Sequence, residues 1–278
     1  MHQTDETGFR LGRTLIQATQ NRVESARLRD APGIVPVSYG RANDEHFWAE
    51  VHRLVESGAK RFCDVGGGAR PVVSLANIQK FGLEYVVLDE AQDRLDKAPS
   101  GYRPFRADIL DKDAISEFLR QHGPFDVVLS RWTAEHIPNG RLFHEQVFSM
   151  LRPGGTAVHF FPTLYAAPFL LNRFIPSKLS ATIVFQLWKD RDRQSKFRAY
   201  YSWCRGPTRR QIRRLQSVGF SVDRYVGFFG HSFYESIKLL HLAHIGFTNL
   251  LLDHPCPSMT TFGLVVLTRP VEASQGDA

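Results

Sequence analysis

A run of three glycines directly after a short apolar stretch is the feature that most limits how this chain can fold. Residues 61–71 read RFCDVGGGARP. Glycine has no Cβ atom, so it permits positive φ angles and lets the backbone come close to a ligand. The proline that follows has a fixed φ and suits the first turn of a helix. The stretch therefore predicts a strand, a tight turn and a helix, with Asp64 close to the end of the strand.

The same alternation of apolar runs and helical patterns continues along the chain. Further strands are expected at 85–89, 106–111, 125–130, 156–161, 220–229 and 260–268. Fully apolar runs of this kind indicate strands buried on both faces of a parallel sheet, with helices packed on each side. We therefore predict an α/β fold with a doubly wound, mostly parallel sheet of seven strands.

Polar residues gather where the expected strands end. In doubly wound sheets, ligands bind beyond the carboxyl ends of the strands. Asp64–Gly68, Asp89, Asp108 and Ser130–His136 all occupy such positions. Asp89 lies 21 residues beyond the last of the three glycines, a spacing that suits a carboxylate for ribose hydroxyls; the alternative is a cap or turn aspartate. Asp108 can accept from an adenine amino group, and Ile109 can pack on the ring.

Taken in order, five segments resemble the class I S-adenosylmethionine-dependent methyltransferases. They are DVGGGARP, YVVLDE, RADILD, FDVVLSRWTAEHIPN and LRPGG, and the resemblance covers roughly residues 45–163. It implies a Rossmann-like methyltransferase fold with an antiparallel last strand, helical inserts that form a lid, and S-adenosyl-L-methionine as cofactor. The chain departs from the family at Arg70, where the usual pattern has a third spaced glycine.

The resemblance also implies which residues bind the cofactor. They are Asp64, Gly66, Gly67, Gly68, Asp89, Asp108, Ile109, Ser130 and Arg131. The first four would flank the methionine part, Asp89 would bind the ribose, and the next two would frame the adenine. The last two would lie near the methionyl end and the substrate entrance.

Candidates for a catalytic base follow the fourth expected strand. In methyl transfer the cofactor supplies the reactivity, and the protein aligns donor and acceptor and in some cases removes a proton. Glu135 and His136 are the candidates. A histidine that is neutral near pH 7 can act as a general base; the alternative is a loop histidine that holds backbone groups. Four aromatic residues can stack on a ring-shaped acceptor or form the core of a lid: Tyr165, Tyr200, Tyr201 and Trp203.

The chain divides into an extension, a main domain and a tail. We expect 1–42 to be an N-terminal extension or lid and 43–270 to be the methyltransferase domain. Inserts at 163–206 and 231–258 are expected to roof the substrate, and 271–278 to be disordered. The histidines of the second insert lack carboxylate or cysteine partners at ligand spacing, so no metal site is expected.

Cysteine usage and hydropathy indicate the compartment. The three cysteines are odd in number and far apart, which fits a reducing compartment. The polar N-terminus lacks the apolar core of a secretory signal. No window reaches the 18 uninterrupted apolar residues that suggest a spanning helix. We therefore expect a cytoplasmic protein, with a peripheral contact to a membrane as an open alternative.

Positive charge is concentrated in one segment. The formal net charge is +7, and the stretch 189–214 holds ten basic and two acidic residues. Such a stretch forms either solvated helix faces or a contact with phosphates, an acidic sugar or an anionic membrane. These observations favour methyl transfer to a small-molecule, glycan or lipid-linked acceptor, with the methylated atom, O, N or C, left open.

Two other functions compete with this interpretation. The first is a nucleic-acid-binding or nucleic-acid-modifying methyltransferase that uses the basic segment. Ser130–Thr133 argues against it, because base-methylating relatives of this family often have Asn/Asp-Pro-Pro-aromatic there. The second is a nicotinamide-dependent Rossmann oxidoreductase, for which the chain lacks the full Gly-x-Gly-x-x-Gly spacing.

Overall fold

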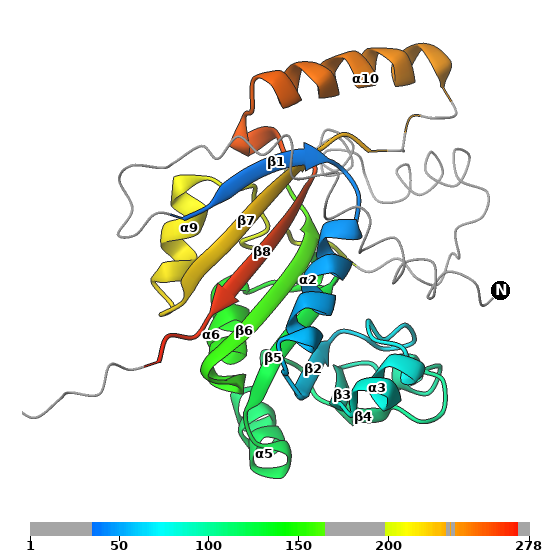
Figure 1. The fold of residues 1–278 in the computed structure, drawn as a ribbon, viewed down its shortest axis with the longest axis vertical. Helices are drawn as coiled ribbons and strands as arrows, with labels where there is room; N and C mark the ends of the chain where they lie inside the picture. The colour runs from blue at the N-terminus through cyan, green and yellow to red at the C-terminus, as the bar shows by residue number, and fades with distance from the viewer. Residues whose placement is uncertain (1–34, 165–197, 232–233, 235–236, 272–278) are drawn as a thin grey trace, which may run out of the picture.

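The computed structural model of the chain describes residues 35–164, 198–231, 234 and 237–271. Within these residues, helices cover both faces of a single eight-stranded sheet (Figure 1). The strands are β1 (Val37–Arg41), β2 (Arg61–Val65), β3 (Glu84–Asp89), β4 (Arg103–Arg106), β5 (Phe125–Arg131), β6 (Leu151–Pro162), β7 (Ser221–Phe229) and β8 (Phe262–Thr268). The helices are α2 (Glu45–Glu56), α3 (Leu75–Phe81), α4 (Gln92–Leu95), α5 (Lys112–His122), α6 (Gly140–Met150), α9 (Arg209–Gln216) and α10 (Lys238–Asp253), with short 3₁₀ turns η2 (Ala134–His136) and η4 (Pro257–Met259).

The strand order confirms the predicted architecture. It runs β1-β7-β8-β6-β5-β2-β3-β4. Strand β8 is antiparallel to both β6 and β7, and the other neighbouring pairs are parallel. Since β8 reverses direction between β6 and β7, those two strands and the β5-β2-β3-β4 half all end at the same edge of the sheet.

The sheet has eight strands where seven were expected. The additional strand, β1, pairs in parallel with the edge of β7 from Val37–Tyr225 to Arg41–Phe229. It lies in the segment that was assigned to the N-terminal extension. Its sequence, VSYGR, is short and only weakly apolar, so the local pattern does not mark it as a strand. Pairing with a strand far away in the sequence, and the stacking of Tyr39 on Phe229 (5.6 Å), place it in the sheet.

Two hydrophobic clusters, one on each face, hold the sheet between its helices. Alternate residues along a strand point to opposite faces. In β5, Val128 joins the cluster with side chains of α5, α6 and α9, whereas Val127 and Leu129 join the cluster with α2 and α3. Burial on both faces explains why the central strands read as continuous apolar runs.

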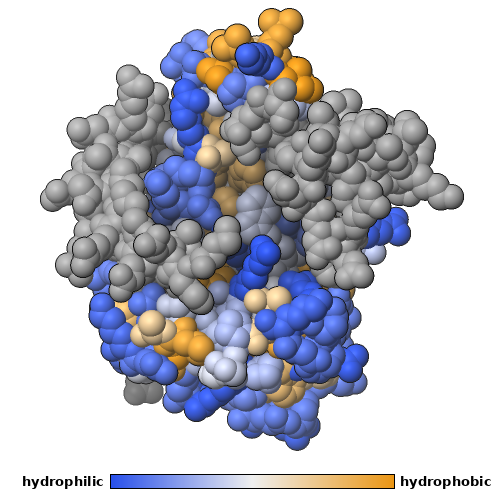
Figure 2. All heavy atoms as spheres, turned by 90° about the vertical axis from the view of Figure 1, so that its right-hand side faces the viewer, coloured by the Kyte–Doolittle hydropathy of each residue, from blue (hydrophilic) through white to orange (hydrophobic). Residues whose placement is uncertain are grey.

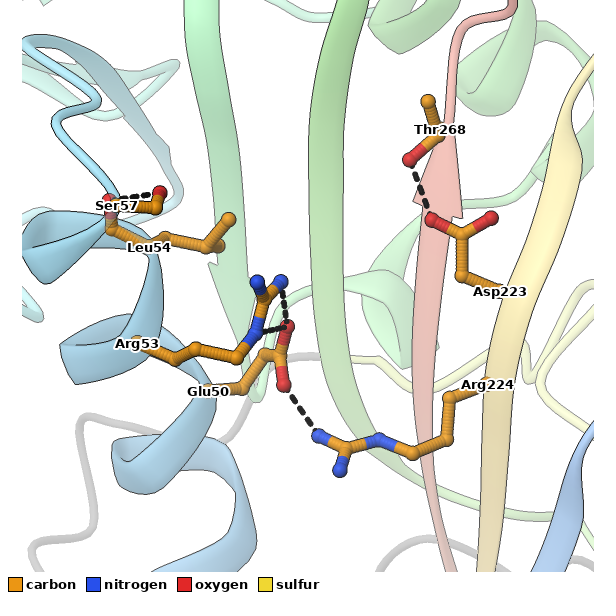
Figure 3. A network of polar contacts seen from close by, with 7 residues as sticks. All are labelled: Glu50, Arg53, Leu54, Ser57, Asp223, Arg224 and Thr268. Atoms are coloured by element: carbon orange, nitrogen blue, oxygen red, sulfur yellow. Dashed lines mark hydrogen bonds and ion pairs between the residues drawn. The ribbon is translucent and has the colours of Figure 1, made fainter.

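A buried carboxylate ties α2 to the sheet. Glu50 accepts hydrogen bonds from Arg53 Nε (3.0 Å) and Nη2 (2.6 Å), and its second oxygen accepts from Arg224 of β7 (Figure 3). Glu50 itself is buried, while both arginines reach solvent. Because a buried charge needs compensating partners, this pair of guanidinium groups fixes the position of α2 along β7.

One expected strand is shifted along the chain, and parts of the expected lid lie outside the described residues. The strand predicted at 106–111 is β4, which ends at Arg106; Asp108 Oδ1 accepts from the Leu110 amide (2.8 Å) and holds a turn instead. The N-terminal residues 1–34, the larger part of the first insert (165–197) and 272–278 lie outside the described residues. A search of the described residues finds no helix with the length and hydropathy needed to cross a membrane.

Candidate active site

A cavity opens at the carboxyl ends of β2, β3 and β5, with further walls from the loops after β4 and β5. Five residues singled out in the sequence line it: Gly66, Asp89, Asp108, Ile109 and His136. Segments that are far apart in the sequence therefore converge on one hollow, at the edge where doubly wound sheets bind ligands.

Asp64 lies beneath the glycine turn rather than in the cavity. Its Oδ2 accepts from the Val72 amide (2.7 Å) and the Tyr85 hydroxyl (2.7 Å). A Cβ atom on Gly67 would lie 2.4 Å from that oxygen, so only glycine fits above it. Burial raises the pKa of the Asp64 carboxyl to about 6, against the lowering effect of the Tyr85 hydrogen bond. The residue therefore fixes the shape of the turn from below.

Asp89 presents a buried carboxylate to the cavity. Its Oδ1 accepts from the Ala91 amide (3.0 Å), while its buried Oδ2 has no hydrogen-bond partner within the described structure. A Cβ atom on Gly68 would lie 2.7 Å from Oδ2. Arg94 Nη2 stands 3.4 Å from Oδ2 and donates to the Gly66 carbonyl (3.0 Å). A buried acceptor with spare capacity beside a bare backbone suits a bound hydroxyl group.

Gly66 allows the turn after β2 to touch the loop after β5. Its φ is +79°, and a Cβ atom there would lie 2.3 Å from Thr133 Oγ1. Its amide donates to the Leu88 carbonyl of β3 (2.7 Å). A side chain at this position would separate the two loops that form the cavity.

The profile of the methyltransferase domain family matches residues 39–224, more than half of the chain. The chain belongs to the methyltransferase domain family. It is an enzyme of the class I type, which uses S-adenosyl-L-methionine, and its sheet has the antiparallel final strand expected for that type.

The solved structures that match the chain are distant in sequence. A SAM-dependent methyltransferase from Archaeoglobus fulgidus is 15% identical, with 82% of this chain and 95% of that chain covered and a TM-score of 0.46. One from Mesorhizobium loti is 18% identical, covering 80% and 97%, with a TM-score of 0.47. Phosphoethanolamine N-methyltransferase 2 from Haemonchus contortus is 15% identical, covering 80% and 53%, with a TM-score of 0.46. No curated protein matches the sequence.

Five of the residues expected at the cofactor of this methyltransferase do not line its cavity: Asp64, Gly67, Gly68, Ser130 and Arg131. The last two are the final residues of β5. Ser130 Oγ lies 2.7 Å from His159 Nδ1, and both side chains are buried on the α6 face of the sheet. Arg131 points to the opposite face, where it pairs with Asp44 and lies 5.2 Å from the Trp48 ring. The sequence locates the end of β5 but not the face toward which each side chain points. A cofactor role for these two residues stays a prediction.

Trp132 and Thr133 line the cavity of the methyltransferase, although neither was singled out as a site residue. Trp132 has a φ of +58°, which is uncommon for a bulky residue. Its ring stands edge-on to Phe160 (5.5 Å) and Phe262 (5.3 Å) and remains partly exposed. The sequence contains one signal that could have identified Trp132 as a site residue, namely its position directly after the end of a central strand.

The two base candidates have different environments. His136 lines the cavity, and its Nδ1 lies 3.1 Å from the Arg198 carbonyl. Burial lowers the pKa of its imidazole, and the nearby Arg94 charge adds to that effect, so the ring is neutral near pH 7. Glu135 is buried, and burial raises the pKa of its carboxyl to about 8. Because such a carboxyl is protonated near pH 7, the geometry and charge favour His136 as proton acceptor.

The segment 198–206 is attached to the loop after β5 through its backbone. The Glu135 carbonyl accepts from the amides of Tyr200 (2.7 Å) and Tyr201 (3.0 Å). Trp203 stacks on the buried His144 (5.6 Å). Tyr165 lies outside the described residues. Among the residues that the structure describes, no group of three or more potential ligands is placed to hold a metal ion.

Proposed function

We propose that the cavity holds S-adenosyl-L-methionine and delivers its methyl group to a small-molecule, glycan or lipid-linked acceptor. The observation that carries the site is the buried Asp89 Oδ2, which accepts no hydrogen bond from the described residues and lies beside the bare Gly68 backbone. A ribose hydroxyl can donate to this oxygen. When bound, the cofactor would supply a methyl group on a sulfonium centre. That methyl group would pass to a nucleophilic atom of the acceptor, and the thioether S-adenosylhomocysteine would leave.

The chain's own residues have distinct tasks in this proposal. Asp64 supports the turn from below. Without side chains, Gly66, Gly67 and Gly68 let the turn pack closely against Thr133, Asp64 and Asp89, which would let its backbone approach the ligand. Asp108 and Ile109 frame the adenine. Trp132 forms an aromatic wall beside the acceptor's entrance.

His136 removes a proton from the acceptor where the chemistry requires it. Its Nδ1 is turned toward the Arg198 carbonyl, so a neutral ring with the proton on Nδ1 leaves Nε2 as the acceptor. That nitrogen lies 3.7 Å from Glu135 Oε1. The backbone carbonyl of Glu135 holds the segment 198–206 to this loop by accepting from the amides of Tyr200 and Tyr201. An acceptor that arrives already deprotonated would make the base unnecessary.

One specific observation favours the nucleic-acid alternative. Helix α9 carries exposed arginines at 209, 210 and 213, and the first two lie in its first turn, where the helix dipole is unfavourable for cations. An anionic partner would offset this cost. Steep salt dependence of RNA or DNA binding would support it, and a flat profile would leave these arginines as a solvated face. The family match excludes the nicotinamide-dependent oxidoreductase.

The experiment that tests the proposal is transfer of a labelled methyl group. The protein is incubated with methyl-labelled cofactor and separate pools of lipids, glycans, polar small molecules and nucleic acids. We expect label in one of the first three pools and its loss in Asp89→Ala. Label that enters only nucleic acid, or Asp89→Ala with wild-type transfer, would contradict the proposal. A structure with S-adenosylhomocysteine would then show the shape of the acceptor pocket. The cytoplasm remains the proposed compartment, with a fractionation experiment as its test.

A further inference from the structure

Helix α10 has its polarity reversed with respect to an ordinary surface helix. Thr248 and Leu251 are buried, and His241 and His244 are half-buried on the side toward β1 and β7. The opposite side exposes large apolar residues to solvent: Leu239 (82%), Leu242 (65%), Leu250 (55%) and Phe247 (45%). Surface helices normally turn the apolar side inward and the polar side outward.

Specific contacts hold α10 in this orientation. The His231 amide donates to His244 Nε2 (3.1 Å), and the two rings stack at 3.9 Å. Arg41 of β1 donates to Asn249. The Thr248 methyl group packs closely over Gly230, where an added Cβ atom would lie 3.0 Å away. Rotating the helix to bury its leucines would break all of these contacts.

The outward side of α10 is largely apolar, with Asn249 as its exposed polar residue between Leu239 and Leu252. No Asp, Glu, Lys or Arg occurs between Leu239 and Leu252. Figure 2 shows hydrophobic residues gathered at the top of the molecule, where α10 lies in Figure 1. Contiguous exposed apolar surface of this kind marks an interaction site for a protein or a membrane.

The size of this surface argues against a second copy of the chain as the partner. A 16-residue helix is about 24 Å long and 10 Å wide, so one side offers on the order of 250 Å². A stable protein interface buries about 800 Å² on each partner. A bilayer has no such threshold, because each apolar side chain that enters it strengthens binding separately.

We propose that α10 docks on the surface of a lipid bilayer by inserting its outward leucines and Phe247. Helix α10 follows β7, whose carboxyl end lies at the same edge of the sheet as the cavity. Docking would therefore bring the cavity edge near the lipid headgroups. This inference deepens the proposed function: it rests on that function only in naming a lipid-linked acceptor, since docking itself requires no methyl transfer.

Flotation with vesicles tests the docking directly. The full-length protein is mixed with neutral phosphatidylcholine vesicles, and with vesicles that also contain phosphatidylglycerol, at low and high salt. We expect wild type to float with both kinds and to remain bound at high salt. Leu239→Glu, Leu242→Glu and Leu250→Glu should each lower the partition coefficient about tenfold or more. Val271→Glu, which changes an exposed apolar residue outside α10 (69% exposed), should leave it unchanged.

Several outcomes would overturn the proposal. Wild type that stays at the bottom of the gradient with both kinds of vesicle shows that α10 is covered by the chain itself or faces water. If wild type does not float but forms a dimer that Leu242→Glu dissociates, the outward side of α10 binds a second copy of the chain instead of a bilayer. Flotation confined to anionic vesicles and lost at high salt or in Arg209→Gln/Arg210→Gln/Arg213→Gln assigns membrane binding to α9 instead. S-adenosylhomocysteine binding by each variant confirms that the variant is folded. If the protein floats with vesicles but transfers no methyl group, the docking of α10 stands and the proposed function fails.

Discussion

The cavity edge at β2 and β3 and the helix α10 beyond β7 reverse the usual distribution of polarity in opposite ways. At the cavity, the carboxylate of Asp89 is buried beside a turn of three glycines. At α10, leucines are exposed while histidines and a threonine face the protein. Each arrangement costs stability unless something compensates. In our proposals, a polar ligand compensates the buried acceptor Asp89, and a lipid environment compensates the exposed leucines.

The largest effect on ligand binding is expected from Gly66→Val, which changes the cavity edge and leaves α10 unaltered. The backbone there has positive φ, and the new side chain would collide with Thr133. We expect loss of S-adenosylhomocysteine binding in calorimetry, with α10-dependent flotation retained if the sheet still folds. Gly58→Ala is the control: its φ is +93°, but a Cβ atom there meets nothing within 4 Å, so a cost of about 1–2 kcal/mol and unchanged affinity are expected. Wild-type affinity in Gly66→Val would show that the turn is not the binding site.

The buried Glu135 predicts a pH-dependent stability. Its pKa is raised to about 8 in the folded protein from the ordinary 4.5. The folded state therefore binds the proton more tightly, so stability is fully present below pH 4.5 and is lost as pH rises toward 8. The loss should reach up to about 4 kcal/mol. Urea denaturation of wild type and Glu135→Gln between pH 5 and 8 measures it. In Glu135→Gln, the free energy of unfolding should depend much less on pH than in wild type. The same pH dependence in both proteins would show that Glu135 is not its cause.

His136→Ala tests the chemistry at the mouth of the cavity. If the neutral ring accepts a proton, turnover should fall about 10²-fold while cofactor affinity changes little. Single-turnover methyl transfer and calorimetry on the same preparation separate the two quantities. Near-normal turnover would show that another group takes the proton or that none is needed.

A smaller effect is expected away from both regions. Glu50→Ala leaves Arg53 and Arg224 without their shared carboxylate. Since both arginines reach solvent, we expect a loss of about 2 kcal/mol in the free energy of unfolding. Cofactor affinity should not change. Glu56→Ala, on the same helix but at an exposed position, is the matched control. A change in affinity with Glu50→Ala would mean that α2 couples to the cavity.

The contrast between the two regions also explains what the sequence could predict. The glycine turn, Asp89 and the apolar central strands are local signals, and the structure confirms the fold that they predict. Strand β1 and the direction of Ser130 and Arg131 depend on pairing and on strand facing, which a local pattern does not contain. The leucines of α10 resemble core residues in the sequence, and only the contacts of His244 and Thr248 show that they face outward.

Asp89 and the turn beside it are the proposed place where the cofactor binds. Isothermal titration with S-adenosylhomocysteine tests this most directly, with Asp89→Ala compared with Asp93→Ala, an exposed aspartate in α4. We predict binding in the micromolar range for wild type and Asp93→Ala. For Asp89→Ala, affinity should fall about tenfold or more, because a charge-assisted hydrogen bond is lost. Equal affinity in all three proteins would contradict the assignment of the site.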